Sequence, residues 1–198
     1  MLRNWYKDLR SACFYVPRTA VRGSARAVSL LFLLSLIPCS LSLTSCSYHS
    51  EDRIPDYPVH INLTGAGNWN TWGVEGFGNY RKFILYQGTR VPSGFPYNTG
   101  AYTGFGGVLL IGGQDPFTTE VGPLAYDLSC PVERSQTVRV DIDPDNYEAV
   151  CPACGSRYNV TSAGGAPISG PAIASGHSYH LQRYNVYGGE YGGYLIRN

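Results

Sequence analysis

Two short cysteine-containing segments constrain this chain more than any other feature of its sequence. Cys130 is followed by Pro131, and 20 residues separate it from the run Cys151–Gly155, in which Cys151 and Cys154 precede a glycine. A Cys-x-x-Cys-Gly turn lets both sulfurs face one metal ion, because glycine accepts the backbone angles that the turn requires. The intervening residues alternate in polarity around the turn sequence 143–146, which predicts a hairpin. We therefore expect the two segments side by side, holding a metal centre or a disulfide.

The N-terminal region has the residue order of a bacterial export signal. Six basic residues precede the apolar run 28–37, which is far shorter than the roughly 20 residues of a membrane-spanning helix. Leu43–Cys46 resembles the lipoprotein cleavage motif, in which an apolar residue and two small residues precede the cysteine that receives lipid. We predict that residues 1–45 are a lipoprotein signal peptide and that Cys46 carries lipid. The lipid would attach the protein to a membrane of the cell envelope, with the outer membrane expected.

The predicted mature chain is acidic and has the length of one domain. Residues 1–45 hold six of the 15 basic and one of the 14 acidic side chains, so residues 46–198 carry a net charge of −4. This charge disfavours a nucleic-acid partner, which would need a basic surface. Residues 46–56 are polar and lack periodicity, which predicts a flexible tether. Residues 57–198 are predicted to form the domain.

The domain is predicted to be all-β, an antiparallel sandwich or barrel. Val59, Ile61 and Leu63 alternate with polar residues, and the apolar run 106–113 between glycines predicts a buried strand. The region 65–107 is rich in glycine and aromatic residues, which favours long turns over helices. Further strands are expected at 81–86, 124–128, 137–142, 147–150, 158–160, 164–168, 180–186 and 194–196.

The second cysteine segment and its surroundings resemble the Rieske iron–sulfur family. Gly155–Tyr158 is similar to the Gly-Ser-x-Tyr sequence of that family, and Gly170–Ala172 is similar to its proline-containing loop. The resemblance covers about residues 105–190, with a cysteine-loop subdomain at about 124–172. The chain looks like a member of a group of exported Bacteroidetes-type lipoproteins that carry Rieske-like domains.

This resemblance implies a Rieske-like fold and a 2Fe-2S cluster. The hydroxyl groups of Ser156 and Tyr158 would form hydrogen bonds to the cluster and to a cysteine sulfur, while Gly170 and Pro171 would cover it. The sequence departs from the family at the ligand positions. Val132 and Cys154 stand where the family has its two histidines. Because valine has no donor atom, the histidine-ligated iron of the family cannot form here.

Four residues are candidate metal ligands, and their chemistry leaves alternatives open. Cys130, Cys151 and Cys154 offer thiolates, and Glu133 follows Cys130 at the spacing with which Cys154 follows Cys151. Zinc accepts a carboxylate among thiolates, so these four residues predict a zinc site as an alternative to the 2Fe-2S cluster. A disulfide within the cysteine trio, with no metal, is a further alternative in an oxidising compartment.

Two functions are consistent with these residues. The first is electron transfer from an iron–sulfur centre with altered ligation to a partner protein of the cell envelope. The alternative is a non-redox binding or structural module on the Rieske fold, held by zinc or a disulfide. A stand-alone enzyme is not expected, because the four histidines fall outside any motif that pairs them with a nucleophile.

Overall fold

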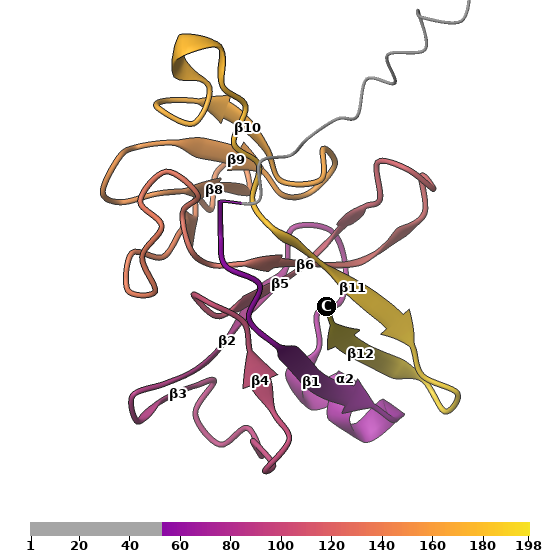
Figure 1. The fold of residues 1–198 in the computed structure, drawn as a ribbon. Coiled ribbons are helices and arrows are strands. Elements are labelled where there is room, and N and C mark those ends of the chain that lie inside the picture. The colour runs from indigo at the N-terminus through magenta and orange to yellow at the C-terminus, as the bar shows by residue number, and fades with distance from the viewer. Residues whose placement is uncertain (1–52) are drawn as a thin grey trace, which may run out of the picture. The chain divides into compact units, whose positions relative to one another are not determined.

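Residues 53–198, which the computed structural model describes, form an all-β domain of two sheets (Figure 1). The larger sheet has eight strands in the order β3-β2-β5-β6-β11-β12-β1-β4, and the smaller has four in the order β10-β9-β8-β7. All strand pairs are antiparallel. The predicted all-β class is therefore confirmed. The predicted signal peptide and the lipidation site Cys46 lie outside the described residues.

The predicted strand segments all overlap observed strands, with one shortened and several elements missed. The order is β1 (Val59–Thr64), α2 (Ala66–Trp72), β2 (Tyr80–Tyr86), β3 (Thr89–Val91), β4 (Tyr102–Thr103), β5 (Val108–Gln114), β6 (Val121–Asp127), β7 (Asp141–Ile142), β8 (Glu148–Val150), β9 (Arg157–Asn159), β10 (Ala166–Ser169), η1 (Ala174–Gly176), β11 (Arg183–Gly188) and β12 (Gly193–Arg197). Helix α2 was not predicted because its sequence has weak helical propensity. Its Trp69 and Trp72 pack against the larger sheet.

The predicted strand 137–142 is interrupted because its first half pairs elsewhere. Val140 N–H donates to Leu128 O at 2.8 Å, Cys130 N–H donates to Val138 O at 3.3 Å, and Arg139 forms an isolated bridge with Ser129. Only the last two residues of the segment, β7, join the smaller sheet. The hairpin therefore binds directly to the chain that leads into Cys130.

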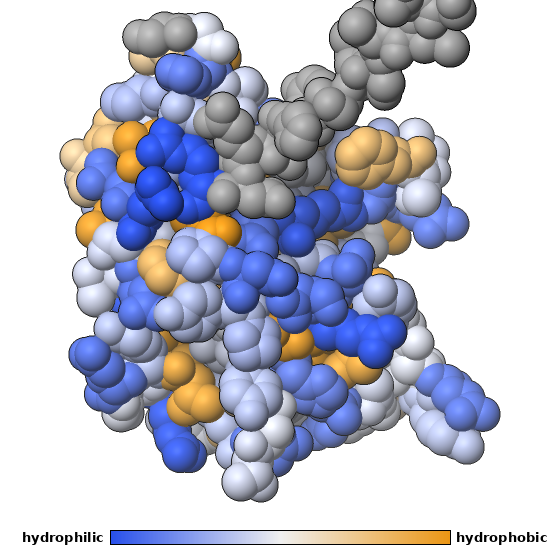
Figure 2. Space-filling model, viewed as in Figure 1, coloured by the Kyte–Doolittle hydropathy of each residue, from blue (hydrophilic) through white to orange (hydrophobic). Residues whose placement is uncertain are grey.

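Strand β5 is buried on both faces, as its apolar run predicts, and it separates two hydrophobic clusters. Val108 and Leu110 face a cluster inside the larger sheet, whereas Leu109 and Ile111 face a cluster shared with the smaller sheet. This division follows from the two-residue period of a strand. On the face seen in Figure 2, hydrophobic residues form only small patches between hydrophilic ones. Most large apolar side chains are thus placed in the two clusters.

The larger sheet curls so that its two ends approach each other. Strand β4 pairs with β1 at one end of the sheet, and the hydroxyl oxygen of Thr103 in β4 accepts a hydrogen bond of 3.1 Å from Leu85 N–H in β2. The resulting enclosure contains Ile61, Leu63 and Phe83, which are fully buried. The inward positions predicted for β1 are therefore correct.

The folded domain begins earlier than the predicted start at residue 57. Ile54 is buried, the Arg53 guanidinium lies 4.1 Å from the Tyr179 ring centre, and Arg53 O accepts a hydrogen bond of 3.0 Å from Arg134 Nε. Residues 53–56 therefore belong to the domain rather than to a tether. Burial of Ile54 removes apolar surface from water, which favours this contact. The remainder of the predicted tether lies outside the described residues. Within residues 53–198 no helix has the length and apolar character needed to cross a bilayer.

The packing of β5 generates the first prediction. Leu109→Ala removes a fully buried side chain from the cluster that joins the two sheets, so it should lower the free energy of unfolding by about 2–5 kcal/mol. Val121→Ala is the matched control, because Val121 is 75% exposed and its truncation should change that free energy by less than about 0.5 kcal/mol. Urea unfolding followed by tryptophan fluorescence measures both. Equal losses of unfolding free energy in the two variants would contradict the burial of Leu109 in this cluster.

Candidate metal centre

The two cysteine segments form turns with the same backbone geometry. Arg134 N–H donates to Cys130 O at 2.8 Å, and Gly155 N–H donates to Cys151 O at 2.9 Å. The residue that closes each turn has a positive φ, 52° at Arg134 and 72° at Gly155. Glycine adopts such an angle without strain, whereas arginine does not, so the first turn carries a strain that its sequence does not reveal. In this correspondence Glu133 occupies the position of Cys154.

The three cysteine sulfurs come together at the end of the smaller sheet. Cys130 follows β6, whereas Cys151 and Cys154 lie between β8 and β9. Their sulfur atoms all lie within 4.8 Å of one another, and Cys130 Sγ is 3.7 Å from Cys154 Sγ. All three are free thiols. The predicted convergence of the cysteines is therefore confirmed, and the trio can hold a metal ion.

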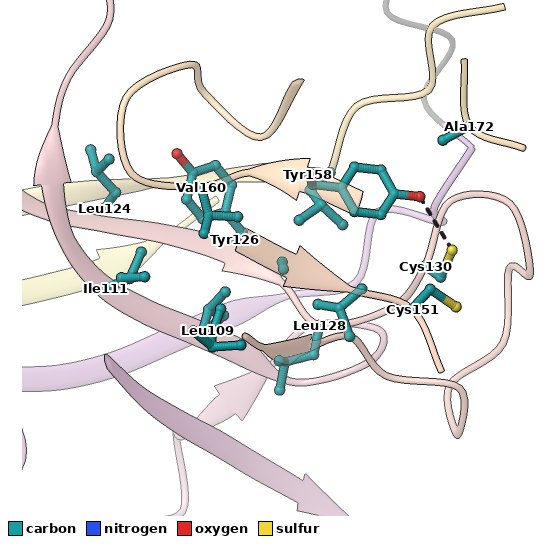
Figure 3. Packing of buried hydrophobic residues seen from close by; sticks show 14 of the residues in the cluster. Leu109, Ile111, Leu124, Tyr126, Leu128, Cys130, Cys151, Tyr158, Val160 and Ala172 are labelled. Atoms are coloured by element: carbon teal, nitrogen blue, oxygen red, sulfur yellow. Dashed lines mark hydrogen bonds between the residues drawn. The ribbon is translucent and has the colours of Figure 1, made fainter. Parts of the chain in front are cut away.

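Two buried hydroxyl groups contact these sulfurs. Tyr158 Oη is 3.3 Å from Cys130 Sγ, as Figure 3 shows, and Ser156 Oγ is 3.2 Å from Cys154 Sγ. Both side chains are fully buried. Ser156 Oγ accepts a hydrogen bond of 3.1 Å from Ala172 N–H and one from the neutral Cys154 thiol. When Cys154 ionises, the serine hydroxyl hydrogen can turn toward the sulfur and donate to it. These contacts stabilise a thiolate, since hydrogen bonds to ionised acceptors are stronger than those to neutral ones.

The loop 170–172 lies directly against the second cysteine turn. A Cβ atom at Gly170 would be 2.8 Å from Ser156 Cα, so only glycine allows this approach. The positive φ of 84° at Gly170 also favours glycine at this position. Pro171 is exposed, whereas Ala172 is fully buried in the cluster that contains Cys130 and Cys151. Gly170 and Ala172 thus attach the loop to the cysteine turn, and Pro171 faces outward.

The Cys130 and Cys154 thiols have unequal acidity because their surroundings differ. Burial raises the pKa of Cys130 to about 12, although the Tyr158 hydroxyl and the backbone N–H groups of Glu133 and Val132 act in the opposite direction. Burial also opposes ionisation of Cys154, but hydrogen bonds from Ser156 and the neighbouring cysteines outweigh it and lower the pKa below its usual value. Cys154 is therefore the first of these two thiols to ionise.

The residues at the other predicted ligand positions have different surroundings. Glu133 is exposed, and its carboxylate is not part of the group formed by the three sulfurs among residues 53–198. Its backbone N–H instead acts on Cys130. Val132 is half-buried and packs against the hydrophobic cluster. Val132 therefore makes an apolar contact at the position where the Rieske family has a histidine ligand. That Glu133 is the fourth ligand stays a prediction.

A buried carboxylate fixes the chain before Cys130. Asp127 is fully buried and accepts hydrogen bonds from the backbone N–H groups of Phe105 at 2.9 Å, Gly106 at 3.0 Å and Ser129 at 2.6 Å. Tyr184 Oη donates to it at 2.6 Å. Burial raises the pKa of Asp127, while the hydrogen bond from Tyr184 and those from the backbone lower it. The glycine-rich turn at 104–107 was the available signal, because its free N–H groups bind an anion.

The arrangement can bind one thiophilic ion at a shielded position. A groove of about 1200 Å³ lies elsewhere, between residues 53–56, 116–117, 162–164 and 180–183. The cysteine trio does not line this groove. No family model matches this chain, and no curated protein matches it.

The unequal acidity generates a prediction for the metal-free, reduced protein. Iodoacetamide should modify Cys154 before Cys130, because the thiolate is the nucleophile and a lower pKa gives more thiolate at a given pH. Ser156→Ala should slow modification of Cys154, since it removes a hydroxyl donor and raises the pKa again. Peptide mass spectrometry after brief labelling measures both rates. Preferential labelling of Cys130 would contradict the proposed environment.

The carboxylate network generates a pH-dependent prediction. Tyr184→Phe should lower the free energy of unfolding at neutral pH by about 1–3 kcal/mol, because the buried Asp127 carboxylate loses a donor. The Tyr184 hydrogen bond lowers the pKa of Asp127, so it favours the ionised form. The loss should therefore shrink as pH falls through that pKa. Tyr187→Phe, at an exposed tyrosine, is the control for denaturation measured across the acid range. A loss that grows on acidification would exclude this role.

Proposed function

We propose that this protein is a lipid-anchored protein of the cell envelope, with a Rieske-like fold held together by one metal ion. Cys130, Cys151 and Cys154 provide its ligands, and the role is that of a non-redox binding or structural module. The observation that carries the proposal is the 3.7 Å separation of the Cys130 and Cys154 sulfurs. Two thiolates on one tetrahedral zinc ion, with Zn–S of about 2.3 Å, lie roughly 3.8 Å apart.

The residues present do not fit a 2Fe-2S cluster of the Rieske type. In that arrangement the positions of Cys130 and Cys154 belong to different irons, which would hold the two sulfurs further apart than a single ion does. Val132 offers no ligand to complete the second iron. A single ion requires neither a histidine nor bridging sulfide.

Binding of one ion to these cysteines would join two separate parts of the chain. Cys130 lies after the larger sheet's β6, and Cys151 and Cys154 lie on the smaller sheet's β8–β9 turn. A metal that bridges them binds the folded state and not the open chain, so its binding energy adds to folding. The metal would then stabilise the junction between the sheets.

The cellular setting of the proposal comes from the N-terminal sequence. The lipoprotein-type segment that ends at Cys46 supports attachment to the outer membrane through lipid, with a protein of the envelope as partner. The net charge of −4 over residues 46–198 favours neither nucleic acid nor direct electrostatic binding to anionic lipid.

Electron transfer is the second candidate, and one observation favours it. Ser156 and Tyr158 place hydroxyl groups at 3.2 and 3.3 Å from cysteine sulfurs. Hydrogen bonds to the sulfur ligands raise the reduction potential of an iron–thiolate centre. The same donors also stabilise thiolates on a redox-inactive ion, so metal analysis must decide between the two functions.

Metal analysis of protein purified without oxygen distinguishes the two functions. We expect one metal ion per chain, no acid-labile sulfide and no visible iron–sulfur chromophore. Removal of the ion by a chelator should lower the melting temperature, because the junction between the sheets loses its bridge. Cys151→Ser serves as a variant that cannot load fully. Stoichiometric iron with sulfide would contradict the structural proposal and support electron transfer. A protein that contains no metal when purified, and whose melting temperature a chelator does not change, would exclude both functions.

A further inference from the structure

The number of protein ligands at the cysteine centre limits the kind of ion that it can prefer. Three sulfurs form the group, and no other His, Cys, Asp or Glu side chain of residues 53–198 joins it. Glu133, at the corresponding position of the first turn, has an exposed side chain. Structural zinc sites have four protein ligands in nearly all cases. Zinc would therefore need a rearranged Glu133 or a bound water to complete its shell.

The three-sulfur group is compact and consists of soft ligands. All sulfur-to-sulfur distances are within 4.8 Å, and that between Cys130 and Cys154 is 3.7 Å. An ion in the plane of three thiolates at ordinary metal–sulfur lengths of roughly 2.3 Å requires separations of about 4 Å. Soft thiolate ligands select Cu(I), zinc and iron–sulfur clusters, and of these ions zinc ordinarily takes a fourth protein ligand. As a filled-shell ion without a geometric requirement for four ligands, Cu(I) is satisfied by three thiolates.

The hydrogen-bond donors around the sulfurs match the charge of such a complex. Three thiolates around a monovalent ion carry the same net charge as four thiolates around a divalent ion, and this charge must be stabilised within a largely buried site. Tyr158 and the backbone N–H groups of Val132 and Glu133 act on Cys130. Ser156 acts on Cys154 through both its hydroxyl and its backbone N–H. The donors thus surround the sulfurs without supplying a fourth ligand.

The three cysteines differ in their accessibility to an incoming ion. Cys130 and Cys151 are buried, whereas Cys154 is partly exposed. The loop 170–172 lies against the turn that carries Cys154, with Gly170 in contact with the Ser156 backbone. An ion or a carrier thiol can therefore reach Cys154 first and then be transferred to the two buried sulfurs. This route suits Cu(I), which moves between thiolates by ligand exchange.

We propose that Cys130, Cys151 and Cys154 form a three-coordinate Cu(I) site, with Glu133 outside the coordination shell. This inference rests on the proposed single-ion centre and names its ion and coordination number. It makes the protein a copper-binding component of the cell envelope. Because Cu(I) is bound as such, no electron is transferred on binding.

The test uses the full-length chain in detergent, with Cys13, Cys39 and Cys46 replaced by serine so that only the three cysteines of the centre remain. Anaerobic titration with Cu(I) against a chromophoric Cu(I) chelator should give one ion per chain, and copper X-ray absorption should show three sulfur neighbours. Excess Zn(II) should not displace the ion. Glu133→Gln should change the Cu(I) affinity less than about twofold, because its exposed side chain makes no contact with the ion.

Each further outcome separates this inference from the proposed function. Cys154→Ser should weaken Cu(I) binding roughly 100-fold or more, beyond the 10–100-fold that loss of an outer hydrogen bond causes. Circular dichroism checks that the variant is folded. Preference for Zn(II) with three sulfurs and one oxygen, weakened by Glu133→Gln, would overturn the copper site and keep the single-ion function. Failure of both metals to bind would overturn both.

Discussion

The hydrophobic cluster shared by the two sheets is the interaction on which the rest of this structure depends. Leu109 and Ile111 from β5 pack there with Tyr126 from β6 and Tyr158 from β9, and the cluster continues into Cys130 and Cys151 (Figure 3). Each large apolar side chain that is fully buried contributes about 1.5–3 kcal/mol. Cys130 and Cys151 therefore belong to the core itself, and Cys154 packs against it.

Hydrogen bonds from backbone N–H groups fix the chain segment that leads into Cys130. The Asp127 carboxylate accepts N–H groups from the glycine-rich turn and from Ser129, so the last residues of β6 are fixed just before Cys130. A buried carboxylate is costly unless such donors surround it. Because the donors are backbone groups, the direction of the chain at Cys130 depends on the turn at 104–107, which is distant in sequence.

Much of the fold could be predicted from the sequence, because strand patterns are local. The alternation in β1 and the apolar run of β5 identify buried faces, and the spacing of the cysteines identifies their convergence. The interruption of segment 137–142 could not be predicted, since its partner is the chain at 128–130. The same holds for the positive φ of Arg134, which makes the first turn equivalent to the second although no glycine marks it. Asp127 was missed as a structural anchor because three of its donors, Phe105, Gly106 and Tyr184, are distant from it in sequence.

The residues on which the Rieske resemblance rests have a role at this site without iron, because they support the cysteine thiolates and the turn that carries them. Ser156 and Tyr158 contact cysteine sulfurs, and a hydroxyl donor lowers the cost of a buried negative charge whichever ion neutralises it. Gly170 allows the loop 170–172 to approach the second cysteine turn closely, and this role does not depend on which ion is bound. At the two ligand positions, Val132 and Cys154, the sequence differs from the histidines of the family that it resembles. Residues that support thiolates are therefore compatible with a different ligand set and a different ion.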